Sequence, residues 1–359
     1  MNDTSKMQLF LFAKIQKNRD KYTLNISFYY LCKGMDKIEV QIFSKSDELP
    51  EMTCGNFFHS IELFRIIEKT PGQWPYMAVA YSGDGTIVGH LLAIMRRRGS
   101  LIPPYFFTQG HIYGEGDYPD GVAKSEIFGC LLEAITKKFK GNLCLFAEFS
   151  DISKKMFGYR QFRNNSYFPI SWQEIHNSLH SLPPAERLSG KQLRRIRRIG
   201  KLGVETREVI NLDELNAFYK ILKHDNRLRL RRLIPSLELF TGFFKSDKGK
   251  IFVTLYKGSI IGGCVCVFTG GNAYLWYLAS KTKSYSRLHT NTMTVWHALN
   301  YSYQQNYAHF YFLDAGLPWR SSHYRDFILR FGGKPVAKFR WFRISISWIT
   351  HLLTWIYRD

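Results

Sequence analysis

The hydrophobic positions along the chain repeat one pattern twice. In the first half, an apolar run from Met77 to Tyr81 leads to a glycine-bounded turn, Gly85–Gly89, and a second apolar run follows. In the second half, the run Phe252–Tyr256 leads to the turn Gly258–Gly262, which lies 173 residues after the first turn. Two apolar runs joined by a short turn that contains glycine predict a β-hairpin. The sequence therefore predicts the same hairpin in each half of the chain.

The parallel between the two halves continues after each hairpin. An amphipathic helical pattern occupies residues 125–139 in the first half and 291–305 in the second. An apolar strand that ends in an acid follows each helix, at 143–148 and 309–314. A duplicated unit predicts two lobes, and clefts between lobes are preferred sites for small molecules. We therefore expect an α/β protein of mixed α+β type, with two similar domains and a groove between them.

The pattern divides the chain into four segments. Residues 1–54 form a basic N-terminal extension with a first strand, and 55–186 form the first domain with a crossover to the second. Residues 187–345 form the second domain, and 346–359 form an amphipathic tail with its Trp and Leu residues on one helical face. Such a tail suits either a helix that closes the domain or one that lies at a bilayer surface. Residues 1–34 have no partner in the second half, and we expect them to be poorly packed.

Composition narrows the class of protein. The chain has 359 residues, of which 45% are hydrophobic and 16% aromatic, as is typical of a globular protein with room for two cores. A net charge of +21 indicates a polyanionic partner, although lysine kept for solubility is the alternative explanation. No apolar run approaches the roughly 20 residues of a membrane span, no signal peptide is evident, and the six cysteines lack metal-ligand spacing. We therefore expect reduced thiols, no metal and a cytoplasmic location.

Three acids are candidates for handling a proton. Glu115 and Asp117 lie in a glycine-rich loop, and Asp314 ends the strand of the second half. A carboxylate that faces a cleft can accept a proton from an amine or orient it, although for Asp314 an Asx turn is an equal alternative. The chain lacks a nucleophile elbow, a Walker loop, a dinucleotide fingerprint and a His-Glu-x-x-His motif. The sequence therefore predicts chemistry without a covalent enzyme intermediate.

Basic residues concentrate in a helical pattern that begins after Ser189 and runs to Leu202. Apolar residues recur there at three-residue spacing, and basic residues, including Arg194 and Arg198, occupy the remaining surface. The planar fork of arginine suits bidentate contacts to phosphate. A solvated basic face is the alternative. A second arginine cluster lies at 227–232.

Several short motifs follow one another in a recognisable order. They are Phe157-Gly158-Tyr159-Arg160, Arg187-Leu188-Ser189, Arg194, Ile196, Gly203-Val204, Gly258-x-Ile-Ile-Gly262, Phe327 and Phe331-Gly332-Gly333-Lys334. This order, over about residues 55–345, resembles the FemAB/FemX-like aminoacyltransferase branch of the GNAT acyltransferase superfamily. The resemblance implies two tandem GNAT-like domains, each a mixed twisted sheet with flanking helices, around an inter-domain groove. Members transfer an amino acid from aminoacyl-tRNA to the amine of a peptidoglycan precursor, and relatives transfer an acyl group in surface polysaccharide synthesis.

The resemblance also implies roles for individual residues. The family's glycine-and-acid loop falls on the loop that holds Asp117, which is the best match to the family's acid, and Glu115, which is the next. The family's basic residue near the C-terminal Phe-Gly motif falls on Arg330 or Lys334, with an implied phosphate role. The sequence departs from the family's first-domain Arg-Gly-Pro pattern, because His111-Ile112-Tyr113 precedes the acid.

One loop of the second half helps to distinguish between coenzyme A and an aminoacyl donor. In GNAT acetyltransferases a glycine-rich loop wraps the pyrophosphate of coenzyme A. The corresponding residues here, 281–287, contain no glycine. Close approach of the backbone to a pyrophosphate is then harder, which favours an aminoacyl donor.

These observations predict an aminoacyltransferase or acyltransferase that forms an amide on an amine of a cell-envelope precursor of the peptidoglycan type. Aminoacyl-tRNA would be the donor, no resident cofactor is needed, and the acceptor would be lipid-linked or nucleotide-linked, with peripheral contact to an anionic membrane. The predicted catalytic residues are Asp117, Glu115 and Asp314, and the predicted phosphate-binding residues are Arg194, Arg198, Arg330 and Lys334. One alternative is an N-acyltransferase of surface polysaccharide or lipid synthesis that uses a coenzyme A thioester. A second is a non-catalytic protein that binds polyanions.

Overall fold

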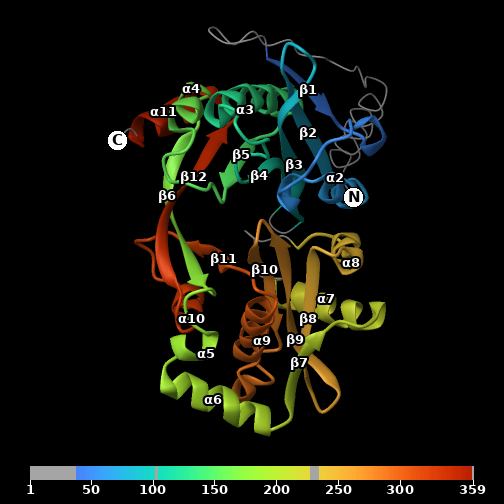
Figure 1. The fold of residues 1–359 in the computed structure, drawn as a ribbon, viewed down its shortest axis with the longest axis vertical. Helices are drawn as coiled ribbons and strands as arrows, with labels where there is room; N and C mark the ends of the chain where they lie inside the picture. Colours follow the sequence, from blue (N-terminus) through green and yellow to red (C-terminus); the bar gives the residue numbers. More distant parts are fainter. Residues whose placement is uncertain (1–37, 102–103, 227–233, 358–359) are drawn as a thin grey trace.

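The computed structural model describes residues 38–101, 104–226 and 234–357, which form two lobes stacked along the long axis of the molecule (Figure 1). The strands in these residues form one hydrogen-bonded sheet in the order β1-β2-β3-β4-β5-β12-β6-β11-β10-β9-β8-β7. The extension expected at 1–34 and the arginine cluster at 227–232 lie outside the described residues.

The first lobe contains the first predicted hairpin. Its strands are β1 (Glu39–Phe43), β2 (Gln73–Tyr81), β3 (Ile87–Leu101), β4 (Pro104–Tyr113) and β5 (Phe146–Ser150). Its helices are η1 (Ser46–Glu48), η2 (Phe57–His59), α2 (Ile61–Glu68), α3 (Lys124–Gly141) and α4 (Tyr159–Asn164). The hairpin is β2 and β3, which pair antiparallel. Helix α3 then crosses from β4 to β5, and these two strands are parallel.

The second lobe repeats this arrangement. Its strands are β7 (Val204–Glu208), β8 (Gly249–Tyr256), β9 (Ser259–Thr269), β10 (Asn272–Ser280) and β11 (His309–Gly316). Its helices are α5 (Pro184–Arg187), α6 (Gly190–Lys201), α7 (Leu212–Asn226), α8 (Leu237–Lys245), η3 (Ser286–Leu288), α9 (Thr290–Gln304) and α10 (His323–Leu329). Strands β8 and β9 form the second predicted hairpin, and α9 crosses from β10 to the parallel strand β11. The prediction of a mixed α+β fold with two tandem lobes is confirmed.

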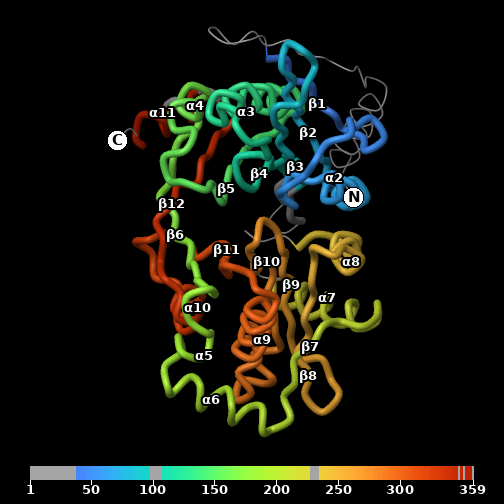
Figure 2. The backbone as a smooth tube through the Cα atoms, in the orientation of Figure 1, coloured from blue at the N-terminus to red at the C-terminus, as the bar shows by residue number. Residues whose placement is uncertain are grey.

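Two long strands belong to both lobes. Strand β6 (Phe168–Ser178) pairs antiparallel with β12 (Lys334–Ile344). The end of β12 also pairs with β5 of the first lobe, whereas the end of β6 pairs with β11 of the second. Figure 2 shows β6 and β12 as the connection between the lobes. Residues in the middle of this ribbon therefore lie between the lobes, and a C-terminal strand of the predicted second domain, 187–345, completes the sheet of the first lobe.

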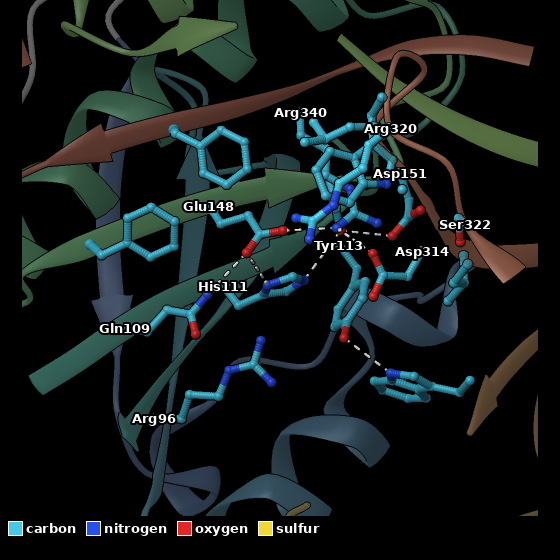
Figure 3. Close-up of a pocket in the computed structure, with 18 of the residues that line it drawn as sticks. Arg96, Gln109, His111, Tyr113, Glu148, Asp151, Asp314, Arg320, Ser322 and Arg340 are labelled. Atoms are coloured by element: carbon cyan, nitrogen blue, oxygen red, sulfur yellow. Dashed lines mark hydrogen bonds and ion pairs between the residues drawn. The ribbon is translucent and has the colours of Figure 1, made fainter. Parts of the chain in front are cut away.

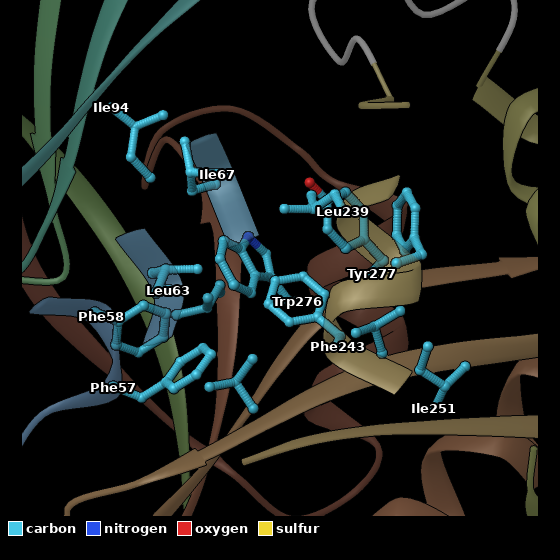
Figure 4. Packing of buried hydrophobic residues seen from close by; sticks show 14 of the residues in the cluster. Phe57, Phe58, Leu63, Ile67, Ile94, Leu239, Phe243, Ile251, Trp276 and Tyr277 are labelled. Atoms are coloured by element: carbon cyan, nitrogen blue, oxygen red, sulfur yellow. The ribbon is translucent and has the colours of Figure 1, made fainter. Parts of the chain in front are cut away.

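Apolar side chains of both lobes meet in one shared core (Figure 4). Phe58 and Ile67 of the first lobe are buried in the same cluster as Phe243 and Trp276 of the second. The ring centroids of Phe58 and Phe243 lie 5.6 Å and 5.2 Å from that of Trp276. Burial of apolar surface stabilises such a contact by about 25 cal/mol per Å². The lobes are therefore packed against each other beside the ribbon as well as joined by it.

Two expectations from composition can be compared with the fold. Among the helices in the described part of the chain, none combines the length and the apolar character that crossing a bilayer requires. Cys54, Cys144, Cys264 and Cys266 carry free thiols. Cys130 is disulfide-bonded, so the expectation of a fully reduced set is wrong at this residue. The cytoplasmic location stays a prediction.

Candidate active site

A cavity of about 810 Å³ lies between the lobes, beside the shared ribbon (Figure 3). Strands β3, β4 and β5 line it from the first lobe, and β10, β11 and the loop after β11 line it from the second. The middle of β6 and β12 closes it. Three arginines, Arg96, Arg320 and Arg340, share its wall with three acids, Glu148, Asp151 and Asp314. Ionisable groups of both signs therefore gather where the two lobes meet.

Alternation along the strands places the first-lobe residues in this cavity. Successive side chains of a strand point to opposite faces of the sheet. Gln109, His111 and Tyr113 of β4 line the cavity, whereas Ile112 is buried in the core beneath α3. Glu148 of β5 lines the cavity in the same way, next to strand residues that are buried on the other face. The cavity thus has a polar floor built from a sheet whose reverse face is apolar.

Glu148 is the centre of a polar network on this floor. Its Oε2 accepts a hydrogen bond of 3.0 Å from Gln109 Nε2 and lies 3.6 Å from Nδ1 of His111. Its Oε1 accepts a hydrogen bond of 3.1 Å from Nη1 of Arg340. Burial alone would raise the pKa of this carboxyl, but His111, Arg340 and Arg96 hold it well below its usual range. Glu148 is therefore ionised and anchored.

His111 is neutral at physiological pH. Burial lowers its pKa to about 4, and the charges of Arg96 and Arg340 add to this effect, while Glu148 opposes it. Its Nε2 lies 3.2 Å from Oγ of Ser150. A neutral imidazole has one N–H and one lone pair, so it can both accept and donate a proton.

Asp151 lies beyond Ser150 at the end of β5. Its φ of 58° is in the left-handed region, which aspartate tolerates better than most residues. The Ser150 hydroxyl donates a hydrogen bond of 2.7 Å to its Oδ2. Burial, together with the nearby charge of Glu174, raises the pKa of Asp151 to about 7, although Arg340 opposes this. Asp151, Ser150 and His111 thus form a line of groups that can carry a proton near neutral pH.

The second lobe contributes a gap between two parallel strands. Strands β10 and β11 pair from Asn272↔His309 to Leu275↔Phe312. Beyond that point each strand has an irregularity, and Asp314, with a φ of 68°, lies in that of β11. Its Oδ1 lies 3.4 Å from Nη1 of Arg340. The predicted acid Asp314 is therefore in the cavity, where β10 and β11 separate.

Arg340 connects the acids of the two lobes. The same Nη1 contacts Glu148 Oε1 of the first lobe and Asp314 Oδ1 of the second. Its guanidinium carbon lies 4.1 Å from the ring centroid of Trp172, which is within the range of a cation–π contact. Arg340 thus brings together one acid from a strand of each lobe.

The structure places the other two predicted acids outside the cavity wall. Asp117 Oδ2 accepts hydrogen bonds from the backbone N–H groups of Gly55 and Asn56, at 2.6 and 2.8 Å. Glu115 accepts hydrogen bonds from the backbone N–H and the hydroxyl of Ser153, at 2.9 and 2.6 Å. Both carboxylates thus connect loops of the first lobe. Their catalytic roles stay predictions.

None of the four predicted phosphate-binding residues lines the cavity: Arg194 and Arg198 lie on α6, Arg330 follows α10, and Lys334 begins β12. Arg198 of α6 and Arg330, at the end of α10, both lie close enough to His289 to lower its pKa, together with burial and Arg195. His289 directly precedes α9. Arg194 is also on α6 and is exposed. Both Arg198 and Arg330 therefore lie within electrostatic range of the residue that directly precedes α9.

Sequence reasoning missed most of the cavity wall. Arg340, His111 and Ser150 were not among the predicted site residues. Their signal is polar residues at alternate positions in strands that are otherwise apolar, such as Gln109 and His111 in β4. The same alternation describes a strand with one solvent-exposed face, so the signal gains meaning only when the partner strand is known.

Comparison with known proteins agrees with the two-lobe fold. Residues 190–324 match the family model described as an acetyltransferase (GNAT) domain. The fold is similar to that of FemX, with a TM-score of 0.57 and 11% identity over 86% of this chain and 96% of that one. It is also similar to L-PGS from Bacillus licheniformis, with a TM-score of 0.52 and 14% identity over 86% of this chain and 100% of that one.

A third solved structure has the same arrangement. It is a tandem GNAT protein from the clavulanic acid biosynthesis pathway, with a TM-score of 0.53 and 10% identity over 84% of this chain and 91% of that one. A search of curated protein sequences finds no match. At these identities the structural likeness concerns the fold. The chain therefore has a two-lobe fold similar to those of FemX and of the tandem GNAT protein, and its residues 190–324 match an acetyltransferase (GNAT) domain.

Proposed function

We propose that the protein transfers an aminoacyl or acyl group to an amine in the inter-lobe cavity, without a covalent enzyme intermediate. One observation carries the proposal: Glu148 and Asp314 converge on Arg340 where β10 and β11 separate. Three positioned charges from three parts of the fold favour a site that orients substrates. An activated ester or thioester needs little more than such alignment and stabilisation of the developing oxyanion.

The donor would be anchored at the N-terminus of α9. Backbone N–H groups at a helix N-terminus attract anions, and the charges of Arg195, Arg198 and Arg330 all act on His289, which directly precedes this helix. The first helical residue, Thr290, is 3% exposed, and its hydroxyl has no hydrogen-bond partner among the described residues. A phosphate group would supply that partner. The acyl end of the donor would then extend between β10 and β11 toward the cavity.

Aminoacyl-tRNA is the proposed donor. The loop between β10 and α9 lacks the glycines that let a backbone wrap a pyrophosphate, and its Lys281, Lys283 and Arg287 suit a larger polyanion. A coenzyme A thioester is the second candidate, because the family model that matches this lobe is an acetyltransferase domain. The fold supports both donors.

Asp151 is the proposed proton acceptor. With a pKa of about 7, a large share of it is ionised at neutral pH, when it can take a proton from an ammonium group. Protonated Asp151 can donate to Ser150 Oγ, and the Ser150 hydroxyl can then donate to the free Nε2 of neutral His111. Asp314, the more exposed acid, would orient the ammonium group beforehand.

The proposed step is balanced without any further reactant. The ammonium group loses one proton to the carboxylate, and the resulting neutral amine attacks the donor carbonyl carbon and gives up a second proton as the intermediate collapses. A C–N bond forms, and the C–O bond of an aminoacyl ester or the C–S bond of a thioester breaks. The leaving oxygen or sulfur takes up a proton. Neither oxidation nor reduction occurs.

The acceptor would be an anionic molecule that carries a free amine. Arg96 and Arg320 lie at opposite ends of the labelled group in Figure 3 and can each bind a carboxylate or phosphate. Arg325 of α10 holds the Arg320 loop by donating to the carbonyls of Leu317 and Arg320, both at 2.7 Å. A cell-envelope precursor of the peptidoglycan type combines amines with such anionic groups, and the FemX-like fold supports this choice.

Amide formation measured by mass spectrometry tests the proposal. Purified protein is incubated with a muropeptide precursor and either aminoacyl-tRNA or acetyl-coenzyme A. We expect product with the tRNA donor, and we expect Asp314→Asn to lower kcat by about 10²-fold or more with a smaller change in KM. The matched control is Asp120→Asn, an exposed acid outside the cavity. Product from neither donor, with similar stabilisation of the protein by any polyanion, would support polyanion binding without catalysis.

Donor anchoring has its own matched pair of variants. Arg198 and Arg197 are neighbouring exposed arginines of α6, but only Arg198 is among the charges that act on His289. We expect Arg198→Ala to weaken donor binding, measured as the ligand-induced rise in Tm, and Arg197→Ala to leave it unchanged. Equal losses would mean that charge alone binds the donor.

A further inference from the structure

Helix α11 (Ser347–Ile356) presents an apolar face to solvent. Trp348, Leu352 and Trp355 follow one another at i, i+4 and i+7, so they lie on one side of the helix. Their side chains are 69%, 47% and 65% exposed. Figure 1 places the helix at the outer end of the first lobe, beside α4. Large apolar side chains at such exposure are costly in water unless something covers them.

The helix is nevertheless fixed to the lobe at both ends. Thr350 contacts Ile344 through two hydrogen bonds, because its hydroxyl meets both the N–H and the carbonyl group of that residue. Arg163 of α4 donates to the carbonyl of Thr354 at 3.0 Å and to that of Tyr357 at 3.4 Å. The opposite face of α11 is thus held by specific polar contacts. The helix is therefore held in an orientation that leaves its apolar face toward solvent.

A second segment extends this apolar surface. Leu143 and Leu145 precede β5, and their side chains are 82% and 37% exposed. Ser345 holds them beside the start of α11, because its N–H donates to the Leu145 carbonyl at 2.9 Å and its hydroxyl donates to the Cys144 carbonyl. Ile346, which is 40% exposed, follows directly. We call the surface made by residues 143–145, Ile346 and α11 the apolar edge.

The segments that form the apolar edge carry basic and no acidic side chains, although Glu133 and Glu148 directly flank the first of them. The two chain segments that form it, 134–147 and 334–357, contain no Asp or Glu. They contain several lysines and arginines, among them Lys140 and Arg343. Arg163 adds another cation beneath the helix. An apolar surface with basic and no acidic neighbours in its own segments complements an anionic lipid surface better than a neutral protein surface.

A row of aromatic rings leads from the apolar edge to the cavity. The rings of Tyr357 and Phe168 stack at 5.6 Å between centroids, and Phe168 lies 6.2 Å from Phe342. Phe342 stacks on Phe146 at 5.4 Å, and both of these residues line the inter-lobe cavity. The apolar edge is therefore continuous with the apolar wall of the cavity.

We propose that the apolar edge docks the protein on an anionic lipid bilayer. Trp348 and Trp355 would lie at the level of the headgroups, where tryptophan is favoured because its ring is apolar and its N–H is polar. Leu352, Ile346 and Leu143 would enter the boundary of the acyl chains. The cavity would then open next to the membrane, so that a substrate carried by lipid could enter without leaving the bilayer. The docking itself requires neither the proposed donor nor the proposed acceptor.

Vesicle sedimentation tests this proposal with the full chain. Phosphatidylcholine vesicles with and without phosphatidylglycerol are mixed with the wild type, the double variant Trp348→Ala/Trp355→Ala, and Trp319→Ala. Trp319 is 66% exposed but lies in the loop after β11, so it is matched in residue type and exposure. We expect wild type and Trp319→Ala to bind the anionic vesicles alike, and the double variant to bind at least about tenfold more weakly.

Three results would overturn the proposal. Equal binding by all three proteins would mean that basic surfaces elsewhere bind the lipid. Absence of binding by the wild type at about 0.1 M salt, where surface charges still act over about 10 Å, would exclude docking by this surface. A wild-type dimer that the double variant converts to a monomer would mean that a second copy of the chain covers the apolar edge. Unchanged near-ultraviolet circular dichroism shows that the variants are folded, so each result is interpretable.

Discussion

Glu148 and Asp314 lie on the strands that follow the crossover helices of the two lobes, yet their surroundings differ. Glu148 has a side chain that is 12% exposed, and it contacts Gln109 and Arg340, with His111 nearby. The side chain of Asp314 is 49% exposed, and among the described residues it forms an ion pair with Arg340 alone. An acid surrounded by partners is an anchor, whereas an acid with one partner and an open side can bind a substrate. The acid of β5 thus serves structure, whereas the acid of β11 is available for chemistry.

The strands that carry these acids differ in the same sense. In the first lobe, β4 and β5 pair without interruption from Gln109↔Phe146 to Tyr113↔Ser150. In the second lobe, β10 and β11 pair over four residues and then separate. The family model matches only the lobe that has this gap. The two copies therefore differ at this point: β4 and β5 end with their last pair, whereas β10 and β11 continue beyond theirs as separated strands.

Arg340→Met should have the largest effect, because both acids depend on this cation. It would leave the buried carboxylate of Glu148 without its ion-pair partner, and breaking a buried pair costs about 3–5 kcal/mol. Urea denaturation measures the change in the free energy of unfolding. Arg320→Met is the matched control and should stay within about 0.5 kcal/mol, because Arg320 is exposed. A loss below about 1 kcal/mol in Arg340→Met would contradict the central position of this arginine.

The two acids can be separated directly. We expect Glu148→Gln to lower the free energy of unfolding by about 1–3 kcal/mol, because it weakens several buried contacts at once. Asp314→Asn should change it by less than about 0.5 kcal/mol, because the side chain is half exposed. Losses of the same size in the two variants would remove the distinction between anchor and open acid.

Asp151 makes stability depend on pH in a defined direction. Its pKa rises from the ordinary value of 3.8 to about 7 in the folded protein. Between these values the unfolded chain has released the proton while the folded protein retains it, so stability is full below about pH 4 and falls as the pH rises toward 7. The slope is at most about 1.4 kcal/mol per pH unit. Comparing the pH dependence of the free energy of unfolding of the wild type with that of Asp151→Asn isolates the contribution of Asp151. If the wild type instead gained stability relative to this variant as the pH rises over the same range, the prediction would be wrong.

The smallest effect concerns a contact between the third strands of the two repeats. The indole N–H of Trp276 in β10 donates a hydrogen bond of 3.0 Å to the Tyr113 hydroxyl in β4. Tyr113→Phe keeps the ring and removes this acceptor, so we expect a loss of about 1 kcal/mol in the free energy of unfolding. Tyr303→Phe, on the surface of α9, is the control and should have no effect. If Tyr113→Phe leaves the free energy of unfolding unchanged, this hydrogen bond does not stabilise the contact between the lobes.

Local pattern predicted much of the fold. Hairpin turns, the two crossover helices and the strand that ends at Asp314 depend on residues close in sequence, so periodicity and glycine position reveal them. Asp314 was found for this reason. Arg198 and Arg330 were predicted separately, and only the tertiary fold brings both within electrostatic range of His289.

The rest of the site depends on pairing between distant segments. Arg340 reaches Glu148 across 192 residues of chain, because β12 returns to pair with β5. No local sequence pattern predicts which strands will pair with each other. The glycines around Asp117 are explained by backbone geometry, since Gly114 and Gly116 have φ values of 81° and 110°. Such positions favour glycine whether or not a ligand is near.

The most direct measurement is a crystal structure with a donor fragment, either coenzyme A or the aminoacylated 3′ end of tRNA as a stable amide analogue. The account predicts that the phosphates contact Arg195, Arg198 and Arg330 at the N-terminus of α9, and that the acyl carbon reaches the gap between β10 and β11 beside Asp314. A donor bound along β4 and β5 of the first lobe, or outside both lobes, would contradict the division of roles between the two copies.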